Sequence, residues 1–465
     1  MLHASRVRSP KCGGARERNL RDGPEDAFCD VHSFHYQDGR LCCEGVDLGV
    51  VARDLGTPLY VYSEGTILDH YRRLDSALAP LDHLICYAVK ANSNRAILKL
   101  LDAAGAGFDI VSGGELQRVR AAGGQPWKCT FAGVGKSREE IEEALEQGVY
   151  SFNIESEAEL DYIDQIAGAK NLRARIALRA NPDVDPHTHE YISTGRHENK
   201  FGIALEQLPA VYEGAAKMAT IDIVGLQMHI GSQITEAEPF AAAVRKVAPI
   251  VRDLKSKYGI EFFSIGGGIG IVYESSVASG TTEWWDSRKG PASESPQLSI
   301  QQYADALVPP LRELGVRILL EPGRLLVGNA GVLLTRVRYI KSSGQKKFAI
   351  VDAGMNDLIR PALYHSYHEI VPVAQPGAGA IGKIDIVGPV CESGDFFALD
   401  REMPPLQAGD LLAIMSAGAY GFVMASNYNS RLLPAEALVR GDRFALIRDR
   451  QKIEDLVRDE VDPDW

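Results

Sequence analysis

The chain has 465 residues, 45% hydrophobic and 24% charged, a composition typical of a soluble globular protein with room for two domains. Its net charge of -12 argues against nucleic-acid binding, and no apolar run is long enough to span a membrane. We therefore expect the protein to bind neither nucleic acid nor a membrane. The seven cysteines fit neither a disulfide framework nor a zinc site, which predicts a reducing, cytoplasmic location and no metal.

Residues 1–30 differ from the rest because they are rich in arginine and show no hydrophobic period. They lack the apolar core of a secretory signal, and acidic residues such as Glu17 and Asp22 count against a transit peptide. We expect a disordered tail or translation from an upstream start. Residues 31–62 then have the pattern of short strands, with a hairpin at Asp38-Gly39.

From residue 63 to residue 329, apolar runs alternate with amphipathic helical stretches. The predicted strands are 84–89, 107–111, 129–132, 150–154, 174–180, 222–229, 262–265 and 317–321. Such a series of β-α units predicts a closed parallel (β/α)8 barrel. Segment 273–298 interrupts it, is rich in Gly, Ser and Pro, and predicts a mobile loop or lid on the C-terminal face.

After Gly323 the helical rhythm stops, and strand patterns with turn signals follow at 332–340, 347–351, 384–387, 410–414 and 444–447. We expect residues 330–465 to form a mainly β domain. Because the strands of residues 31–62 have no place in the barrel, we expect them to join this domain. The barrel would then be inserted between the two parts of the β domain.

Lys90 stands at the end of the first barrel strand. Lysine is rarely buried without a partner, and desolvation would lower its pKa, so that the neutral amine could attack a carbonyl. Taken alone, a strand-end lysine that reaches solvent is the commoner case. The residues at the other strand ends change that balance.

Several strands are followed by residues suited to one cofactor. At or just after the C-terminal end of the second strand lies Asp109, of the sixth His229 and Ser232, of the seventh Gly266, Gly267 and Gly268, and of the eighth Glu321, Gly323 and Arg324. A histidine can stack on a ring or be an ordinary core residue, and a glutamate can hold a pyridine nitrogen or form a surface pair. The glycine run lies where barrels commonly bind phosphate. With a Schiff-base lysine, these parts predict pyridoxal 5'-phosphate (PLP).

Six motifs carry a specific resemblance when taken together. They are Tyr87-Ala-Val-Lys-Ala-Asn92, His229-Ile-Gly-Ser-Gln233, Gly266-Gly-Gly268, Glu321-Pro-Gly-Arg324, Cys391-Glu-Ser-Gly-Asp395 and Gly418-Ala-Tyr-Gly421. From about Phe34 to Leu438 the chain resembles the barrel-type PLP decarboxylases, most closely the diaminopimelate decarboxylases. The resemblance implies that Lys90 carries PLP, His229 stacks on its ring, Glu321 pairs with the ring nitrogen and Tyr420 lies nearby. It also implies a phosphate site at Ser232, Gly266 to Gly268, Gly323 and Arg324.

The same resemblance implies a small amino-acid substrate. It assigns substrate contacts to Arg324, Arg360, Tyr364, Glu392 and Tyr420, with Cys391 as the catalytic proton donor. It also implies a homodimer with shared active sites, in which Cys391 and Glu392 reach across the interface. The expected reaction is decarboxylation of meso-2,6-diaminopimelate to L-lysine and CO2, the last step of lysine biosynthesis.

Substrate choice depends on the end of the substrate that does not react. Two arginines suit a second carboxylate through bidentate hydrogen bonds, and Glu392 suits an ammonium group. Decarboxylation of ornithine, arginine or carboxynorspermidine is the alternative. An alanine racemase is disfavoured because Glu321 stands where that enzyme has an arginine. A non-catalytic carrier is disfavoured because the chain keeps Lys90, Cys391 and the β domain.

Overall fold

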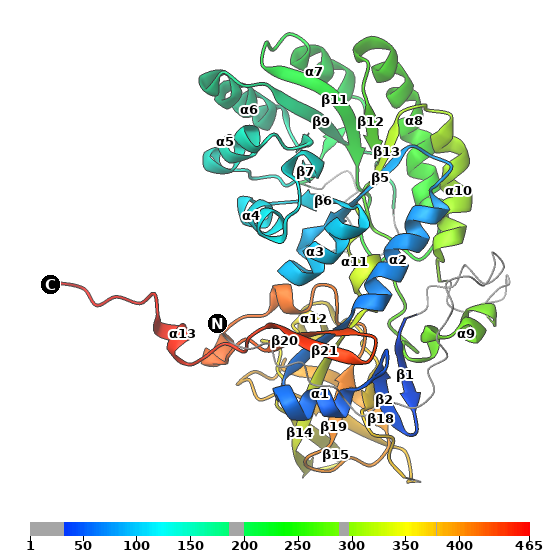
Figure 1. Cartoon of the computed structure of the whole chain (residues 1–465), viewed down its shortest axis with the longest axis vertical. Helices are drawn as coiled ribbons and strands as arrows, with labels where there is room; N and C mark the ends of the chain where they lie inside the picture. Colours follow the sequence, from blue (N-terminus) through cyan, green and yellow to red (C-terminus); the bar gives the residue numbers. More distant parts are fainter. Residues whose placement is uncertain (1–31, 186–199, 288–296, 378) are drawn as a thin grey trace.

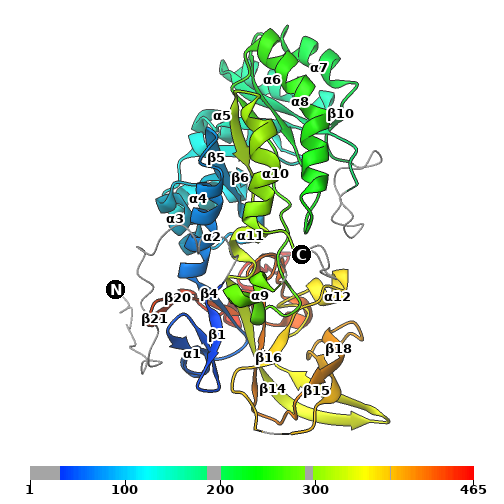
Figure 2. The same ribbon diagram turned by 90° about the vertical axis from the view of Figure 1, so that its right-hand side faces the viewer.

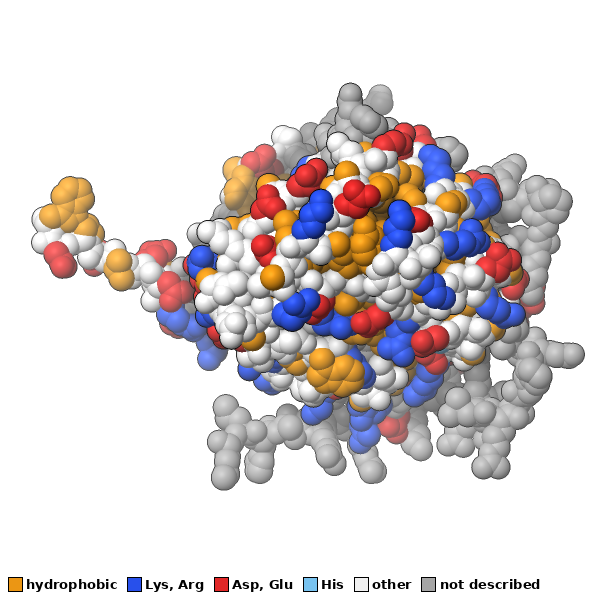
Figure 3. All heavy atoms as spheres, turned by 90° about the horizontal axis from the view of Figure 1, so that it is seen from above, with side chains coloured by type: hydrophobic (Ala, Val, Ile, Leu, Met, Phe, Trp, Pro, Cys, Tyr) orange, Lys and Arg blue, Asp and Glu red, His pale blue; other side chains and the backbone are white. Residues whose placement is uncertain are grey.

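The structure is a computed structural model that describes residues 32–185, 200–287, 297–377 and 379–465. A barrel of strands wrapped by helices lies above a mainly β domain (Figure 1). The predicted tail over residues 1–30 lies outside the described residues. Seen from above, the barrel end carries charged side chains of both signs around a hydrophobic centre (Figure 3).

Parallel strands close the barrel. They are β5 (His83–Ala88), β6 (Gly107–Ile110), β7 (Cys129–Phe131), β8 (Ser151–Ile154), β9 (Ala174–Asn181), β11 (Ile221–Met228), β12 (Phe262–Ser264) and β13 (Arg317–Leu320). β13 returns to β5 with Leu319 opposite Leu84, and β8 pairs with β9, which completes the circle. The predicted (β/α)8 barrel is confirmed. A short strand, β10 (Ile203–Ala204), extends the end of β9.

Helices follow most of these strands, and several of them are capped by polar side chains. They are α3 (Arg95–Ala104), α4 (Gly113–Ala122), α5 (Arg138–Gln147), α6 (Glu157–Lys170), α7 (Leu208–Ala215), α8 (Glu238–Tyr258) and α10 (Ile300–Arg312), while α2 (Glu64–Ala77) precedes β5. Asn94 accepts from the Ala96 N–H, Ser112 accepts from the Glu115 N–H, and Ser137 forms a capping box. Such caps satisfy amides that a helix start leaves free, so the chain can turn directly from strand to helix.

The barrel interior is a packed core around Phe262, the first residue of β12. Cys86, Ala177, Val224 and Leu319 pack with it. A Cβ at Gly225 of β11 would come within 2.5 Å of the Phe262 ring, so only glycine fits there without movement. Because this core fills the barrel around the first residue of β12, space for a ligand remains at the C-terminal ends of the strands.

In the β domain, the long strand β14 (Gly331–Ser343) pairs with β4 (Leu59–Ser63), β15 (Lys346–Val351) and β19 (Leu411–Ile414). Beyond them lie β16 (Ile370–Pro372), β17 (Gly382–Val387), β18 (Phe396–Met403), β20 (Ala435–Arg440) and β21 (Arg443–Arg448), and Figure 2 shows β14, β15, β16 and β18 below the barrel. The sequence does not predict β16, β18 or β20. β16 contains a proline, β18 is rich in charges, and β20 contains helix-forming alanine, glutamate and leucine.

The N-terminal strands enter the β domain in two ways. β4 pairs directly with β14 and β20. In contrast, β1 (Phe34–Gln37), β2 (Arg40–Cys43) and β3 (Val46–Asp47), followed by α1 (Leu48–Leu55), form a sheet of their own. This small sheet is held by packing, because Phe34 and Leu41 share a core with Val332 of β14. The β domain is therefore built from both ends of the chain, as predicted.

The predicted lid over residues 273–298 is anchored where the structure describes it. It contains α9 (Thr282–Asp286), in which Trp285 is buried and donates from Nε1 to the Ser279 carbonyl at 3.0 Å. His32 Nε2 lies 2.6 Å from the Ser276 carbonyl. Segment 288–296 is outside the described residues. Among the described residues, none of the helices has the length and apolar character needed to cross a membrane.

Phe262→Ala should lower the free energy of unfolding by about 3–5 kcal/mol, because it empties the barrel interior. Gly225→Ala should also destabilise, since its methyl group would lie 2.5 Å from the ring. In the double variant the methyl group enters the vacated space, so the two effects should not add. Chemical denaturation of the four proteins measures this coupling, and strict additivity would contradict the contact.

Candidate active site

A cavity of ≈ 360 Å³ lies at the C-terminal ends of the barrel strands, a size suited to a small molecule. It is lined by Ala88, Lys90, His229, Ser232, Gly268, Ile269, Glu321, Gly323, Arg324 and Tyr420. Most of these residues were predicted from the sequence as site residues. Tyr420 comes from the β domain, so the C-terminal ends of the strands face that domain and the cavity lies between the two.

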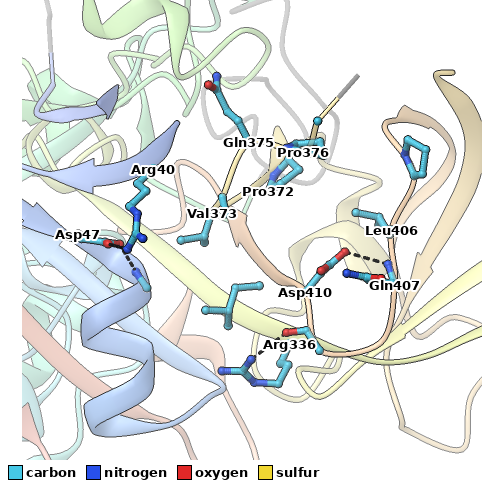
Figure 4. A pocket seen from close by; sticks show the side chains of 16 residues that line it. Arg40, Asp47, Arg336, Pro372, Val373, Gln375, Pro376, Leu406, Gln407 and Asp410 are labelled. Carbon is cyan, nitrogen blue, oxygen red and sulfur yellow. Dashed lines mark hydrogen bonds and ion pairs between the residues drawn. The ribbon is translucent and has the colours of Figure 1, made fainter. Parts of the chain in front are cut away.

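A larger hollow of ≈ 1280 Å³ lies between β2, β3 and the β domain (Figure 4). Its lining includes the ion pair of Arg40 with Asp47, at 2.8 Å, together with Arg336 and the prolines Pro372 and Pro376. None of the predicted site residues lines it. The smaller cavity is therefore the candidate active site, despite its size.

Lys90 is placed by η1 (Val89–Ala91), the single helical turn that follows β5. The turn is held on both sides, because the Ala88 N–H donates to the Pro322 carbonyl at 3.0 Å and the Tyr420 N–H donates to the Ala91 carbonyl at 2.8 Å. The Lys90 ammonium donates to Asp109 Oδ2 at 2.7 Å. Lys90, just after β5, thus reaches a carboxylate on the neighbouring strand β6.

The expectation that the pKa of Lys90 is lowered is wrong. Burial does lower it, but the negative charge of Asp109, with Tyr420 and Glu321, outweighs burial and raises the pKa of Lys90 well above its usual value. Asp109 is fully buried, and its second oxygen, Oδ1, has no hydrogen-bond partner among the described residues. Lys90 is therefore held as a cation beside a carboxylate with spare hydrogen-bonding capacity.

The glycine run joins three strand ends. A Cβ would lie 2.4 Å from the Met228 carbonyl at Gly266, 2.2 Å from the Glu321 carbonyl at Gly267 and 2.4 Å from the Gly231 carbonyl at Gly268. Gly266 and Gly268 also have positive φ angles of 71° and 107°. No side chain fits at these positions, and Gly268, the last of the three, lines the cavity with its backbone.

His229 is held by the same run. The Gly267 N–H donates to its Nδ1 at 3.2 Å, which places the ring proton on Nε2. Burial lowers the pKa of His229 well below its usual value, and the positive charges of Arg179 and Lys90 lower it further. The ring is therefore neutral and is oriented by the backbone.

Glu321, at the end of β13, is buried and fixed by two side chains of neighbouring strands. Ser264 donates to Oε1 at 2.7 Å and Gln227 donates to Oε2 at 2.9 Å. Burial, with the charge of Asp109, raises the pKa of Glu321 to about 7. Sequence reasoning missed Gln227 and Ser264; polar residues inside otherwise apolar strands were the available signal.

Two buried arginines lie on either side of Tyr273, and one of them, Arg324, lines the cavity. Arg324 begins α11 (Arg324–Val327) and Arg360 begins α12 (Arg360–Tyr364). Arg324 donates to Ser232 Oγ at 2.9 Å and to the Tyr273 hydroxyl, while Arg360 donates to Ser366 Oγ at 3.3 Å. Among the described residues, the guanidinium groups of these two arginines hydrogen-bond only to hydroxyl groups.

The electrostatics of this arginine pair are unbalanced. Burial, together with the charge of Arg324, lowers the pKa of Arg360. The Nε atoms of Arg324 and Arg360 are buried and have no hydrogen-bond partner in the described part of the chain. Buried charges are normally paired, so two cations whose hydrogen bonds to described residues go only to hydroxyl groups indicate a site for an anion.

The remaining predicted residues are not all brought together within one chain. The Arg360 guanidinium lies 5.9 Å from the ring centroid of Tyr364, so these two are neighbours. Cys391 and Glu392, in contrast, are exposed on the turn before β18 and do not line the cavity. Cys391 N–H donates to Asn429 Oδ1 at 2.8 Å, and Glu392 accepts from the Tyr428 hydroxyl.

Comparison with known proteins gives consistent matches. Residues 64–328 match the family model described as "Pyridoxal-dependent decarboxylase, pyridoxal binding domain". The chain is 47% identical over 427 residues to diaminopimelate decarboxylase of Pseudomonas aeruginosa, covering 92% of this chain and 98% of that protein.

Two solved structures also match over most of the chain. Diaminopimelate decarboxylase of Helicobacter pylori, complexed with L-lysine, matches with a TM-score of 0.81 and 40% identity, covering 89% of this chain and 98% of that one. The enzyme of M. jannaschii in co-complex with L-lysine has a TM-score of 0.84 and 36% identity, covering 94% and 99%.

Asp109→Asn should lower the pKa of Lys90 by about 1–3 units, because it removes the adjacent negative charge that favours the ammonium form. In protein freed of small molecules, the rate of Lys90 modification by an amine-selective reagent should then rise at lower pH than in the wild type. Peptide mass spectrometry across a pH series measures that rate. Asp75→Asn, on α2, is the control; an unchanged profile for Asp109→Asn would remove this carboxylate as the partner.

Proposed function

Because the chain belongs to the diaminopimelate decarboxylase family, we propose that it converts meso-2,6-diaminopimelate to L-lysine and CO2, with PLP as its cofactor. It is then a carboxy-lyase at the last step of lysine biosynthesis. The observation that supports this choice of substrate is the pair of buried arginines, Arg324 and Arg360, whose guanidinium groups donate hydrogen bonds to hydroxyl groups. We also propose that residues 63–329 form the PLP-binding unit and residues 330–465 the β domain.

The cavity fits PLP on several independent features. Lys90 would hold the cofactor covalently, and the Asp109 oxygen beside it still lacks a hydrogen bond. The glycine run, which no side chain can replace, would hold the phosphate through its backbone, with Ser232, Gly323 and Arg324. The neutral ring of His229 would stack on the cofactor, and Glu321 would face the ring nitrogen.

The cofactor supplies an electron sink for the bond that breaks, and the protein supplies position and charge. Burial and Asp109 raise the pKa of Glu321 to about 7, so Glu321 gains from a cationic N–H donor placed against it. Ser264 and Gln227 keep that carboxylate in one orientation. Asp109 holds a proton on the Lys90 amine, and this proton must leave before the amine can react as a nucleophile.

The far end of the substrate carries a carboxylate and an ammonium group. Arg324 and Arg360 would bind the carboxylate, because a guanidinium group matches its geometry. Neither of these guanidinium groups hydrogen-bonds to a carboxylate among the described residues. Tyr364 and Tyr420 would line this end, and Glu392 would bind the ammonium group. A substrate whose far end carries only an amine, such as ornithine, would leave the two cations without an anionic partner.

We further propose that the enzyme works as a homodimer. Cys391, the proposed proton donor to the carbon that loses CO2, is exposed in the single chain, and so is Glu392. A second copy related by twofold symmetry could present both residues to the cavity of the first. The cysteines that the structure describes are free, which supports a reducing, cytoplasmic location.

Purified enzyme with PLP should release CO2 from meso-diaminopimelate faster than from ornithine. Arg360→Ala should raise KM for meso-diaminopimelate about 10–100-fold, because it removes a charged hydrogen-bond donor from the carboxylate, while the cofactor absorbance remains. Arg338→Ala, on the exposed part of β14, is the matched control. Faster turnover of ornithine would overturn the substrate assignment, and an unchanged KM would place Arg360 outside the site.

Mixing two inactive variants tests the shared site. Lys90→Ala should lose the cofactor absorbance, and Cys391→Ala should keep it but lose most turnover. If each site combines residues from two copies, co-refolded mixtures should regain about a quarter of the wild-type activity, because hybrid dimers contain one complete site. No recovery, with hybrids shown to form by native mass spectrometry, would contradict the sharing of sites.

A further inference from the structure

Tyr273 lies between the two buried arginines, yet it has no role in the function proposed above. Its hydroxyl accepts a hydrogen bond from Arg324. The guanidinium carbons of Arg324 and Arg360 lie 5.8 and 5.4 Å from its ring centroid. The buried His368 meets the same ring edge-on at 5.1 Å between centroids. One phenol therefore contacts both cations that are proposed to bind the substrate carboxylate.

The chain before Tyr273 is fixed by residues from distant parts of the sequence. Gln233 donates to the Ile271 carbonyl at 2.7 Å and accepts from the Ile271 N–H at 3.2 Å. Asn329 Nδ2 donates to the Val272 carbonyl at 2.8 Å, and Ser416 Oγ donates to the same carbonyl at 3.2 Å. The two residues that precede Tyr273 are thus held by both the barrel and the β domain.

The chain after Tyr273 is fixed as well. Ser276 Oγ and Ser416 Oγ are 2.7 Å apart, and the Val277 N–H donates to Glu369 Oε2 at 2.8 Å. Ser416 has a positive φ of 55°, a conformation that non-glycine residues adopt rarely, so its place is also constrained. With both flanks anchored, the fold determines where the phenol stands, independently of the arginines.

A fixed acceptor between two cations changes how they behave. Two guanidinium groups that share a small buried space repel each other, and in the absence of an acceptor they would separate. The hydroxyl oxygen of Tyr273 offsets part of that repulsion. Burial raises the pKa of Tyr273, but the positive charges of Arg324 and Arg360 outweigh burial and lower it. The same two arginines therefore act on the hydroxyl group electrostatically.

We propose that Tyr273 is a positioning residue for the arginine pair. Its hydroxyl holds the guanidinium groups of Arg324 and Arg360 together at one end of the cavity, and so sets the preference for a substrate that carries a carboxylate at that end. This inference rests on the proposed function and adds the residue that organises the carboxylate subsite. The phenol touches the arginines and takes no part in the bond that breaks.

Two ligands that differ by one carboxylate test the inference. L-lysine keeps the carboxylate of the unreacted end, whereas 1,5-diaminopentane lacks it. Tyr273→Phe in the PLP-loaded enzyme should weaken L-lysine binding about 10-fold and change 1,5-diaminopentane binding by less than about twofold, because only the former uses the arginines. Calorimetric titration measures both, and KM for meso-diaminopimelate should rise while kcat stays near its wild-type value.

Two further variants separate this role from a structural one. Tyr303→Phe removes another buried hydroxyl, one without a hydrogen-bond partner among the described residues, and should change neither ligand's affinity. Tyr273→His keeps a hydrogen-bond acceptor and should bind L-lysine more tightly than Tyr273→Phe. Thermal unfolding and the cofactor absorbance of each variant establish that the protein is folded and loaded.

Equal weakening of both ligands by Tyr273→Phe would overturn the proposal in favour of a general structural role. Unchanged L-lysine affinity, or tighter binding, would also overturn it, since the hydroxyl would then be idle or would compete with the carboxylate. The proposed function fails separately, if the wild-type enzyme releases no CO2 from meso-diaminopimelate. Wild-type turnover combined with any of these outcomes would reject the role of Tyr273 alone.

Discussion

Buried charge is balanced at one end of the cavity and left unbalanced at the other. At the barrel end, the Lys90 ammonium faces the Asp109 carboxylate at 2.7 Å, and Glu321 is held by Ser264 and Gln227. At the end formed with the β domain, Arg324 and Arg360 share the phenol of Tyr273, and their hydrogen bonds to described residues go to hydroxyl groups. Because an unpaired buried charge is costly, the second end is built for an anion that the protein does not supply. This asymmetry agrees with the proposed function, in which the cofactor would lie at the barrel end and the substrate carboxylate at the other.

That arrangement requires the two domains to approach very closely, and glycines make the approach possible. A Cβ at Gly418 would lie 1.9 Å from the Val327 carbonyl, and one at Gly331 would lie 2.6 Å from Gly418 Cα. Asn92, two residues after Lys90, donates to the Gly418 carbonyl at 3.1 Å. The buried carboxylate of Glu436 accepts from Asn94 at 2.8 Å, which ties the start of α3 to β20. The loop of Lys90 and the loop of Tyr420 are therefore fixed against each other by backbone contacts that larger residues would prevent.

The barrel could be predicted from sequence because its signals are local. Short apolar runs and polar caps recur at each β-α unit, and the strand ends then follow from the topology. The charge state of Lys90 could not be predicted, since it depends on Asp109, nineteen positions along the chain but in the adjacent strand, and on its distance from the amine. Desolvation alone gave the wrong sign. Tyr273 was missed for a related reason: it begins a stretch whose composition resembles an open loop, and its place depends on contacts with Gln233, Asn329 and Ser416, which no local pattern reveals.

The unbalanced end also bears on the need for a second copy of the chain. An amino acid bound there presents an ammonium group beside its carboxylate, so the cations that attract one group repel the other unless an acid is close. The acid that the family resemblance assigns to this task, Glu392, is exposed in the single chain and accepts from Tyr428. Twofold symmetry would move that acid, with the adjacent Cys391, to a neighbouring cavity while returning an equivalent pair to the first. In the proposed homodimer, residues that are misplaced within one chain would become complementary between two, and the charge pattern of the cavity would supply the physical reason for the exchange.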